Sequence, residues 1–557
     1  MRRRLDSSRN HASYALLIAW LNPLLSSRVA CPPGDWFASQ MGWMSKIVLI
    51  CAAAATMWAG CKADSDNIEA WKGTVKGPTR LMAVVGSDHY SDDLRTEAAL
   101  AIVEMDRSDV SSLNLLREAF DELRREDPQA SETIVAAMVP RLEALLAEES
   151  PSSDNGALQA QVRAKDAAYL VIPYAPEESR AALTRSVVGW YSRDFERRSL
   201  AGDYSAEQVT RSLGAEAAGM LVDALHEKIA PQAMIKIAEI IGEDGDPQTK
   251  KRAADRLVQI EKEMERPRFV QWLSVEIRKS LEAAGEPVDE ARMAAVAIYN
   301  RENYINNGAL AAMKHLADQQ VVSTRLLRIA DTKPGSTDTE AWAERLNARR
   351  ATALRALEGH VKRAHLNRLL SIALDPSNSL EVRDYAFDRV GDIRSRSALP
   401  RLWPLVQRPG CTATSCTASA KLDKRLRWRA GELVLSVGGP STIEKFAQQL
   451  PAVSGVQYEP EELEGYATRM SQMTPPPTST VLELLDSQHW WNRVVALRYL
   501  ERRGGEPDLP AMKRLMTDAT AVVGEGWSEL NPPAKRVGDV AKAAIDALQA
   551  REQGDNE

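Results

Sequence analysis

The chain has 557 residues, of which 44% are hydrophobic, 27% charged and 6% aromatic. This composition is that of a folded protein, and it excludes a collagen-like, globally disordered or polytopic membrane chain. The length predicts several compact domains, unless the chain is a repeat array that grows without closing a single core. Frequent Ala, Leu, Arg and Glu favour helix over strand, so we expect an all-α protein.

Charge is unevenly distributed along the chain. Residues 1–60 contain six basic and two acidic residues, a balance of +4, so the whole-chain charge of −6 leaves −10 for residues 61–557. An acidic body disfavours nucleic-acid binding, because that affinity depends on Lys and Arg side chains that meet phosphates. We therefore expect no nucleic-acid partner, and the charge favours a protein partner with basic patches.

The segment from Met44 to Cys61 carries the most specific signal in the sequence. It reads MSKIVLICAAAATMWAGC, with Lys46 ahead of an apolar run over residues 47–59. The run is shorter than the ~20 residues that a helix needs to cross a membrane. A short apolar run between a basic residue and small residues predicts a signal peptide over residues 44–60.

The last four residues of this segment, Trp58-Ala59-Gly60-Cys61, resemble the lipobox of bacterial lipoproteins. The resemblance implies cleavage before Cys61 and a lipid group on its thiol. Lys62 follows the cysteine, and by resemblance to enterobacterial sorting this implies delivery to an outer membrane. The alternative interpretations are an ordinary secretory signal that is cleaved elsewhere and a buried helix that ends in cysteine.

The segments at either end of the chain are predicted to lie outside the folded body. Residues 1–43 match no signal pattern, and we expect them to precede a true start at Met41 or Met44. A long charged leader or a membrane helix in this region is the alternative. Residues 61–79 are polar and predict a flexible tether, and residues 551–557 predict a disordered tail.

One pattern recurs along the body: a basic residue, Ala three positions later, and an aliphatic residue four positions after that. Steps of three and four place the Ala and the aliphatic residue on one helix face, where Ala permits close approach of a neighbouring helix. The pattern predicts a helical-repeat α-solenoid over residues 80–550, clearest over 350–505. The clear copies are Arg95-Ala98-Ile102, Arg350-Ala353-Leu357, Arg383-Ala386-Val390, Arg427-Ala430-Val434 and Arg493-Ala496-Leu500.

The spacing between copies is uneven. The last four copies are separated by 33, 44 and 66 residues, whereas regular units of this kind run about 40–47 residues. We therefore expect insertions between repeats, at the stretches rich in Gly, Ser or Pro. These stretches are residues 150–156, 333–338, 410–420 and 451–478.

The clearest unit covers residues 369–406. It predicts a helix that ends near Leu374, a turn that contains Asp375, a second helix that opens with Val382-Arg383, and Ala398-Leu399-Pro400 at the start of the next helix. These residues resemble HEAT repeats, in particular bacterial phycobilisome-lyase-like HEAT domains. The resemblance implies a ladder between adjacent repeats, formed by Asp residues in turns and Arg residues in helices. Its expected members are Asp88, Arg95, Arg350, Asp375, Arg383, Arg427, Asp486 and Arg493.

Residues typical of catalysis or metal binding form no recognisable motif. His360 and His365 lie five positions apart, which places them about 140° apart on a helix, so one metal ion cannot readily take both. The turn residues Asp88 and His89 are more typical of a capping Asp beside a surface His than of an acid–base pair. We expect no cofactor, no metal site and no enzymatic activity.

Two further pairs of residues carry structural predictions. Cys411 and Cys416 are separated by four residues in a loop, and in an exported protein this arrangement predicts a disulfide. Trp490 and Trp491 could expose one ring as a recognition spot, because adjacent helical residues face different sides. The favoured interpretation packs both rings, one in the core and one against the neighbouring repeat.

These features predict an exported, lipid-anchored α-solenoid of the cell envelope, on an outer membrane facing the periplasm or at the cell surface. Its expected role is a scaffold for protein–protein interaction, with partners that the sequence does not name. The lipid would be its contact with the membrane. Two alternatives are a HEAT-like lyase or other modifying enzyme, and a cytoplasmic HEAT scaffold whose N-terminus is misread.

Overall fold

The computed structural model describes residues 63–105, 112–148, 155–335 and 339–554. Within these ranges the chain folds into helices and forms no strand, and isolated bridges at Thr412 and Ala521 only tie loops together. The expected all-α class is confirmed. The proposed lipidation residue Cys61, the signal segment 44–60 and residues 1–43 lie outside the described residues.

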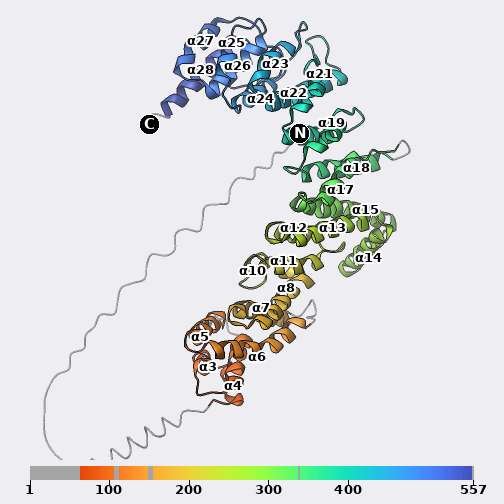
Figure 1. Cartoon of the computed structure of the whole chain (residues 1–557). Coiled ribbons are helices and arrows are strands. Elements are labelled where there is room, and N and C mark those ends of the chain that lie inside the picture. The colour runs from red at the N-terminus through yellow and green to blue at the C-terminus, as the bar shows by residue number, and fades with distance from the viewer. Residues whose placement is uncertain (1–62, 106–111, 149–154, 336–338, 555–557) are drawn as a thin grey trace, which may run out of the picture. The chain divides into compact units, whose positions relative to one another are not determined.

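The helices follow one another along the chain (Figure 1). The first group is α2 (Ser65–Trp71), α3 (Gly77–Gly86), α4 (Asp92–Glu104), α5 (Ser112–Glu126), α6 (Pro128–Ala147), α7 (Asn155–Val171), α8 (Glu177–Arg193), α9 (Phe195–Arg198), α10 (Ala206–Leu213) and α11 (Ala215–Leu221). The second is α12 (Pro231–Asp244), α13 (Pro247–Met264), α14 (Pro267–Ala284), α15 (Glu290–Tyr304), the π-helical turn η3 (Ile305–Leu310), α16 (Ala311–Met313), α17 (Gln320–Asp331) and α18 (Glu340–Ala356). The third is α19 (Leu366–Leu374), α20 (Leu380–Ile393), α21 (Leu399–Val406), α22 (Ala418–Gly438), α23 (Ile443–Gln449), α24 (Pro460–Ser471), α25 (Thr478–Leu484), α26 (Trp490–Arg503), α27 (Leu509–Arg514) and α28 (Val537–Gly554).

Neighbouring helices stack in two rows. In the first group, α3, α5 and α7 pack side by side, and α4, α6 and α8 form a second row against them. From α18 to α28 each even-numbered helix packs against the next even-numbered one, and odd-numbered helices lie beside them. Each pair therefore buries its apolar faces against its neighbours, which is the packing of a helical-repeat solenoid.

The recurring Ala and aliphatic residues lie in the contacts between helices. Ala386 of α20 and Ala430 of α22 are fully buried, as are Val390 and Val434 one turn later on the same faces. Ala98, Ala353 and Ala496 occupy the equivalent places in α4, α18 and α26. A methyl side chain at these places lets the backbones approach closely, which is why the pattern marks the repeats.

Polar side chains at the helix starts define where the repeats turn. Ser91, Asp246 and Ser379 each accept a hydrogen bond from a backbone N–H in the first turn of the helix that follows. These N–H groups have no partner inside the helix, so the caps satisfy them. Proline opens several helices, among them α13 at Pro247, where its missing N–H costs nothing.

The chain from Ser65 is folded, which differs from the expected flexible tether over residues 61–79. Ile68 and Trp71 of α2 are buried against α3 and α4, and Lys72 donates a hydrogen bond to Glu104 at 2.8 Å. Their three-residue spacing gives α2 an apolar face that its polar average composition conceals. At the other end, α28 continues to Gly554 into the expected tail, and residues 555–557 are outside the described residues.

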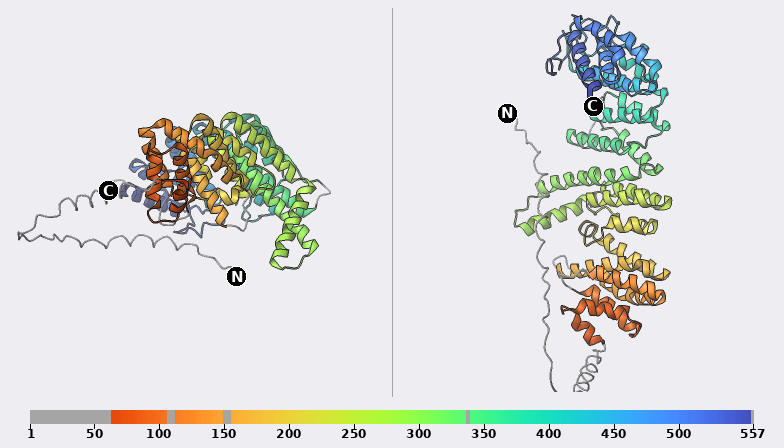
Figure 2. Two further views of the ribbon diagram at one scale, coloured as in Figure 1. Left: turned by 90° about the horizontal axis from the view of Figure 1, so that it is seen from below. Right: turned by 90° about the vertical axis from the view of Figure 1, so that its left-hand side faces the viewer.

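A helical hairpin interrupts the stacking between α13 and α17. Helices α14 and α15 pack against each other and extend beside the array, as both panels of Figure 2 show in green. The π-helical turn η3 joins α15 to α16, and Gly308 in that turn lies against Pro231, where an added methyl group would meet its ring at 3.4 Å. The hairpin is therefore an insertion that separates two helices which nevertheless pack together.

Candidate functional site

The repeat arginines bind the ends of the helices that precede their own. Arg383 of α20 donates from Nε to the carbonyl oxygen of Ala373 at 3.0 Å, near the end of α19. Arg95 makes the same bond to Val85 at 3.0 Å, and Arg350 to Ala330 at 2.9 Å. The last carbonyl groups of a helix lack hydrogen-bond donors and carry a negative partial charge. A buried guanidinium supplies both a donor and a positive charge.

The aspartates of the expected ladder bind other groups. Asp375 accepts hydrogen bonds from Lys333 and from Ser377 in its own turn. Asp88 contacts His89 on the exposed turn, and Asp486 approaches Arg514 at 3.5 Å. These aspartates therefore do not pair with the arginines of the expected Asp–Arg ladder. The guanidinium groups lie in the interior, whereas the turn aspartates lie nearer to water.

Contacts from one repeat to the next do exist, with other acceptors. Arg350 donates to Oδ1 of Asn378 at 2.8 Å, and Arg493 pairs with Asp518 at 2.8 Å. Neither acceptor belongs to the Asp residues of the sequence pattern. The useful signal in the sequence was the arginine, whereas its partner depends on the stacking angle of the next helix pair.

Arg383→Ala should lower the free energy of unfolding by about 1–3 kcal/mol, because it leaves the buried Ala373 carbonyl without a donor. Asp375→Ala, which removes a more exposed contact, should cost less than about 1 kcal/mol. Urea unfolding of both variants measures this difference. Equal losses, with no further loss in the double variant, would instead favour the direct Asp–Arg ladder.

Arg427 of α22 is a fully buried charged group of the array. It pairs with both carboxylate oxygens of Glu462 at 2.8 Å and donates to the carbonyl oxygen of Gln457 at 2.9 Å. The ring of Tyr458 lies 4.2 Å from the guanidinium, and the hydroxyl of Tyr466 donates to Glu462 at 2.7 Å. Burial opposes the charge, but the attraction of Glu462 outweighs it and raises the pKa of Arg427.

The structure places both the cysteine pair and the tryptophan pair of the sequence analysis. A disulfide joins Cys411 to Cys416 in the loop before α22, and the carbonyl of Cys411 accepts from the backbone N–H of Gln457 at 2.9 Å. Trp490 and Trp491 are 7% and 5% exposed and pack around Tyr458. Neither tryptophan ring is a recognition spot on the surface.

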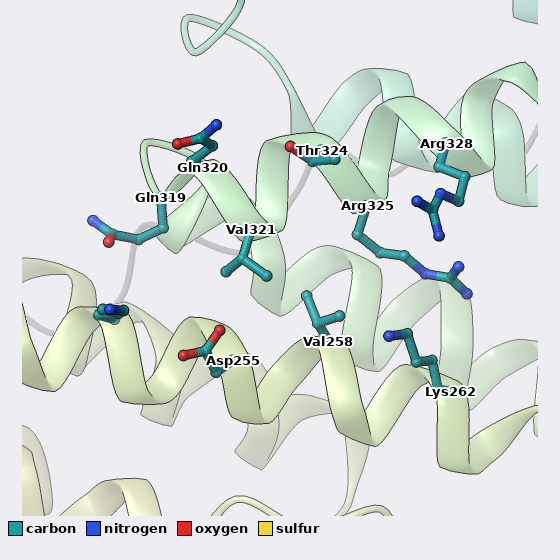
Figure 3. Close-up of a pocket in the computed structure, with 10 residues that line it drawn as sticks. Asp255, Val258, Lys262, Gln319, Gln320, Val321, Thr324, Arg325 and Arg328 are labelled. Atoms are coloured by element: carbon teal, nitrogen blue, oxygen red, sulfur yellow. The ribbon is translucent and has the colours of Figure 1, made fainter.

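A groove lies on the surface between α13 and α17, with a volume of about 490 Å³. Figure 3 shows Val258 of α13 and Val321 of α17 pointing toward each other across it. Lys262 of α13 lies at the same end of the groove as Arg325 and Arg328 of α17. The groove is therefore apolar at its centre and cationic at that end.

The opposite end carries a further cation together with polar groups. Lys251 and Asp255 come from α13, and Gln319 and Gln320 stand at the start of α17. Lys251, Lys262 and Arg328 are exposed. Four basic residues and one acidic residue thus line a groove in a body whose formal charge is −10.

Sequence reasoning did not identify this groove. Lys262 and Arg328 lie 66 positions apart, with the α14–α15 hairpin between them. Their proximity follows from the packing of α13 on α17, which no local pattern reports. The only local signal was the place of Lys251, Asp255, Val258 and Lys262 on one face of a helix.

Arg325 connects the groove to an ion network in the interior. It donates to both carboxylate oxygens of Glu261 at 2.8 and 2.9 Å. Glu265 then links Arg325 at 3.4 Å to Arg349 at 3.0 Å, and Arg349 pairs with Glu302. Burial alone would lower the pKa of Arg325, but the hydrogen bonds to Glu261 outweigh it and raise that pKa. The position of Arg325 is therefore set from inside the fold.

The network makes the stability of the protein depend on pH. Burial opposes the charge of Glu302, but the hydrogen bonds from Arg349, at 2.6 and 2.8 Å, outweigh it and lower the pKa of Glu302. Because the pKa of Glu302 is lower in the folded than in the unfolded state, its charge stabilises the fold at pH values above the unfolded-state pKa of about 4.3. This stabilisation is lost as the pH falls through the folded-state pKa.

Glu302→Gln should therefore reduce stability at pH 7 and flatten its decline below about pH 5. Unfolding by urea at a series of pH values measures the slope. Glu282→Gln, at an exposed position of α14, is the matched control and should leave the slope unchanged. The same slope in Glu302→Gln and in the wild type would contradict the assignment.

The described residues form neither a metal site nor a membrane-spanning helix. Across residues 63–105, 112–148, 155–335 and 339–554, no group of three or more His, Cys, Asp or Glu residues is placed to hold a metal ion. Among the helices that the structure describes, none is long and apolar enough to cross a membrane.

Comparisons with known proteins give a likeness in fold only. No protein-family model and no curated protein sequence matches the chain. Among solved structures, the karyopherin Kap121p bound to the SUMO protease Ulp1p is 14% identical, with a TM-score of 0.35 over 88% of this chain and 47% of that chain. Kap121p bound to Pho4p is 15% identical, with a TM-score of 0.35 over 92% and 48%. The chain spans about half the length of these karyopherins.

Proposed function

We propose that the protein is an exported, lipid-anchored scaffold whose helical-repeat body binds other proteins. The observation that carries the proposal is the stacking of helix pairs from α3 to α28. In such an array each pair contacts only its neighbours, so the outer helix faces stay available for a partner along the whole length. This architecture supports binding over an extended surface.

The anchoring part of the proposal rests on the sequence from Met44 to Cys61. Its apolar run ends in Gly60-Cys61, the arrangement of a bacterial lipoprotein signal. A lipid on Cys61 would hold the body at a membrane of the cell envelope, and the proposed compartment suits the disulfide between Cys411 and Cys416, because such bonds persist in oxidising compartments.

Crosslinking followed by mass spectrometry, on protein extracted from native membranes, tests the binding function. The expected result is a reproducible set of crosslinks from lysines of the body to one or a few other proteins. Recovery of no crosslinked protein, together with a small-molecule conversion that a single substitution abolishes, would overturn the scaffold and favour a lyase or related enzyme.

A further inference from the structure

The groove between α13 and α17 has the dimensions of an extended peptide. Lys251, Asp255, Val258 and Lys262 follow one face of α13 at steps of four, three and four. The two lysines lie eleven positions apart, so their Cα atoms are roughly 16 Å apart along the helix axis at about 1.5 Å per residue. An extended chain rises about 3.3 Å per residue, so about five residues span this length.

The cations at the two ends are available to a ligand. In the part of the chain that the structure describes, the side chains of Lys251, Lys262 and Arg328 are exposed and have no hydrogen-bonded acceptor. Arg325 is already paired with Glu261 and Glu265, so its charge is largely neutralised and the cations left for a ligand are the other three. One small anion cannot reach both ends, because the ends are roughly 16 Å apart. A ligand that uses all these cations must itself be extended and carry separated negative charges.

The middle of the groove suits a polypeptide. Val258 is buried and Val321 half-buried, so together they form an apolar floor. Gln320 and Thr324 of α17 are exposed beside this floor. An amide and a hydroxyl can each donate and accept hydrogen bonds, which matches the alternating N–H and C=O groups of an extended backbone. Asp255 would repel a carboxylate near the middle and so confine the negative charges to the ends.

We propose that this groove binds an extended acidic segment of a partner protein, about five residues long, with carboxylates at both ends and an apolar side chain at its centre. The inference rests on the proposed protein-binding function and names the chemistry of one partner. It also separates this site from the rest of the body, whose net negative charge favours basic partners elsewhere. Nucleic acid is disfavoured, because the groove offers few cations within an acidic body.

Fluorescence anisotropy of a labelled peptide tests the proposal on the full-length protein purified in detergent. The probe is a five-residue peptide with two glutamates on each side of a leucine. Lys262→Glu combined with Arg328→Glu should weaken its binding by about tenfold or more, because two attractive charges become repulsive. Binding by the wild type should also weaken as the salt concentration rises.

The matched control is Lys421→Glu combined with Lys513→Glu, which makes the same change in net charge at two exposed positions of other helices. This variant should bind the peptide like the wild type. Equal weakening in both double variants would overturn the groove as the site, because it would show an effect of net charge alone. No binding of the peptide by the wild type, or tighter binding of a labelled oligonucleotide or of anionic vesicles, would also overturn the proposal.

The outcomes distinguish this inference from the proposed function. Crosslinks from other helices to a partner, with no affinity for the acidic peptide, would support the scaffold function and contradict peptide binding in the groove. Crosslinks from Lys251 or Lys262 to an acidic stretch of a partner would support both.

Discussion

Arg427→Ala should lower the free energy of unfolding by about 3–5 kcal/mol, the range for breaking a buried ion pair by removing one partner. The reason is that Glu462 and Arg427 are both 0% exposed, so the variant leaves a carboxylate in the interior without its counter-ion. The carbonyl of Gln457 would lose its donor, and the ring of Tyr458 would lose the guanidinium packed against it. Urea unfolding of the purified protein measures the loss.

Two further variants separate the ion pair from the packing around it. Arg427→Met with Glu462→Leu replaces both charges by apolar groups of similar size, so it should recover most of the loss. Arg425→Ala, on an exposed position two residues earlier in α22, removes an ion pair with Asp384 and should cost less than about 1 kcal/mol. A small effect of Arg427→Ala, similar to that of Arg425→Ala, would contradict the assigned role of the buried pair.

Cys61→Ser should abolish lipid attachment and release the protein from membranes, or leave an unprocessed precursor. The thiol is the proposed acceptor of the lipid, and a serine hydroxyl at the same place does not replace it. Growth with a clickable fatty acid, followed by purification and fluorescence detection, measures the attachment. Cell fractionation of the same cultures measures the release.

A nearby cysteine provides the matched control for this experiment. Cys51 lies within the apolar run, ten residues before Cys61, and Cys51→Ser should retain the label and the membrane association. Label that persists in Cys61→Ser would contradict lipid attachment at Cys61. Absence of label from the wild type would contradict the proposal that the protein is a lipoprotein.

The repeat architecture could be predicted from the sequence because it depends on local spacing. Ala386 and Val390 lie four positions apart, and a helix with 3.6 residues per turn puts them on one face whatever surrounds it. The same local logic locates the turns, since Ser379 caps α20 through bonds that span three residues. Such features are determined within one helix and its first turn.

The partners of the arginines could not be predicted in the same way. Arg383 was expected to meet Asp375, eight positions earlier, but its Nε donates to the carbonyl of Ala373. Which of the two groups the guanidinium reaches depends on how α19 and α20 cross. A similar limit applies to α2, where the polar tether expected around Ile68 and Trp71 is a helix packed against α3 and α4.

The sequence by itself therefore determined the helical class and the repeat face, and it predicts the lipid-acceptor cysteine, because these features depend on residues close together in the chain. The tertiary structure alone decided the groove, because Lys262 and Arg328 meet across the inserted α14–α15 hairpin. The buried pair of Arg427 and Glu462 also depends on tertiary packing, because the two residues lie 35 positions apart in the sequence. Helix periodicity places side chains within about one turn of each other, whereas contacts across an insertion depend on how the whole stack of helices closes.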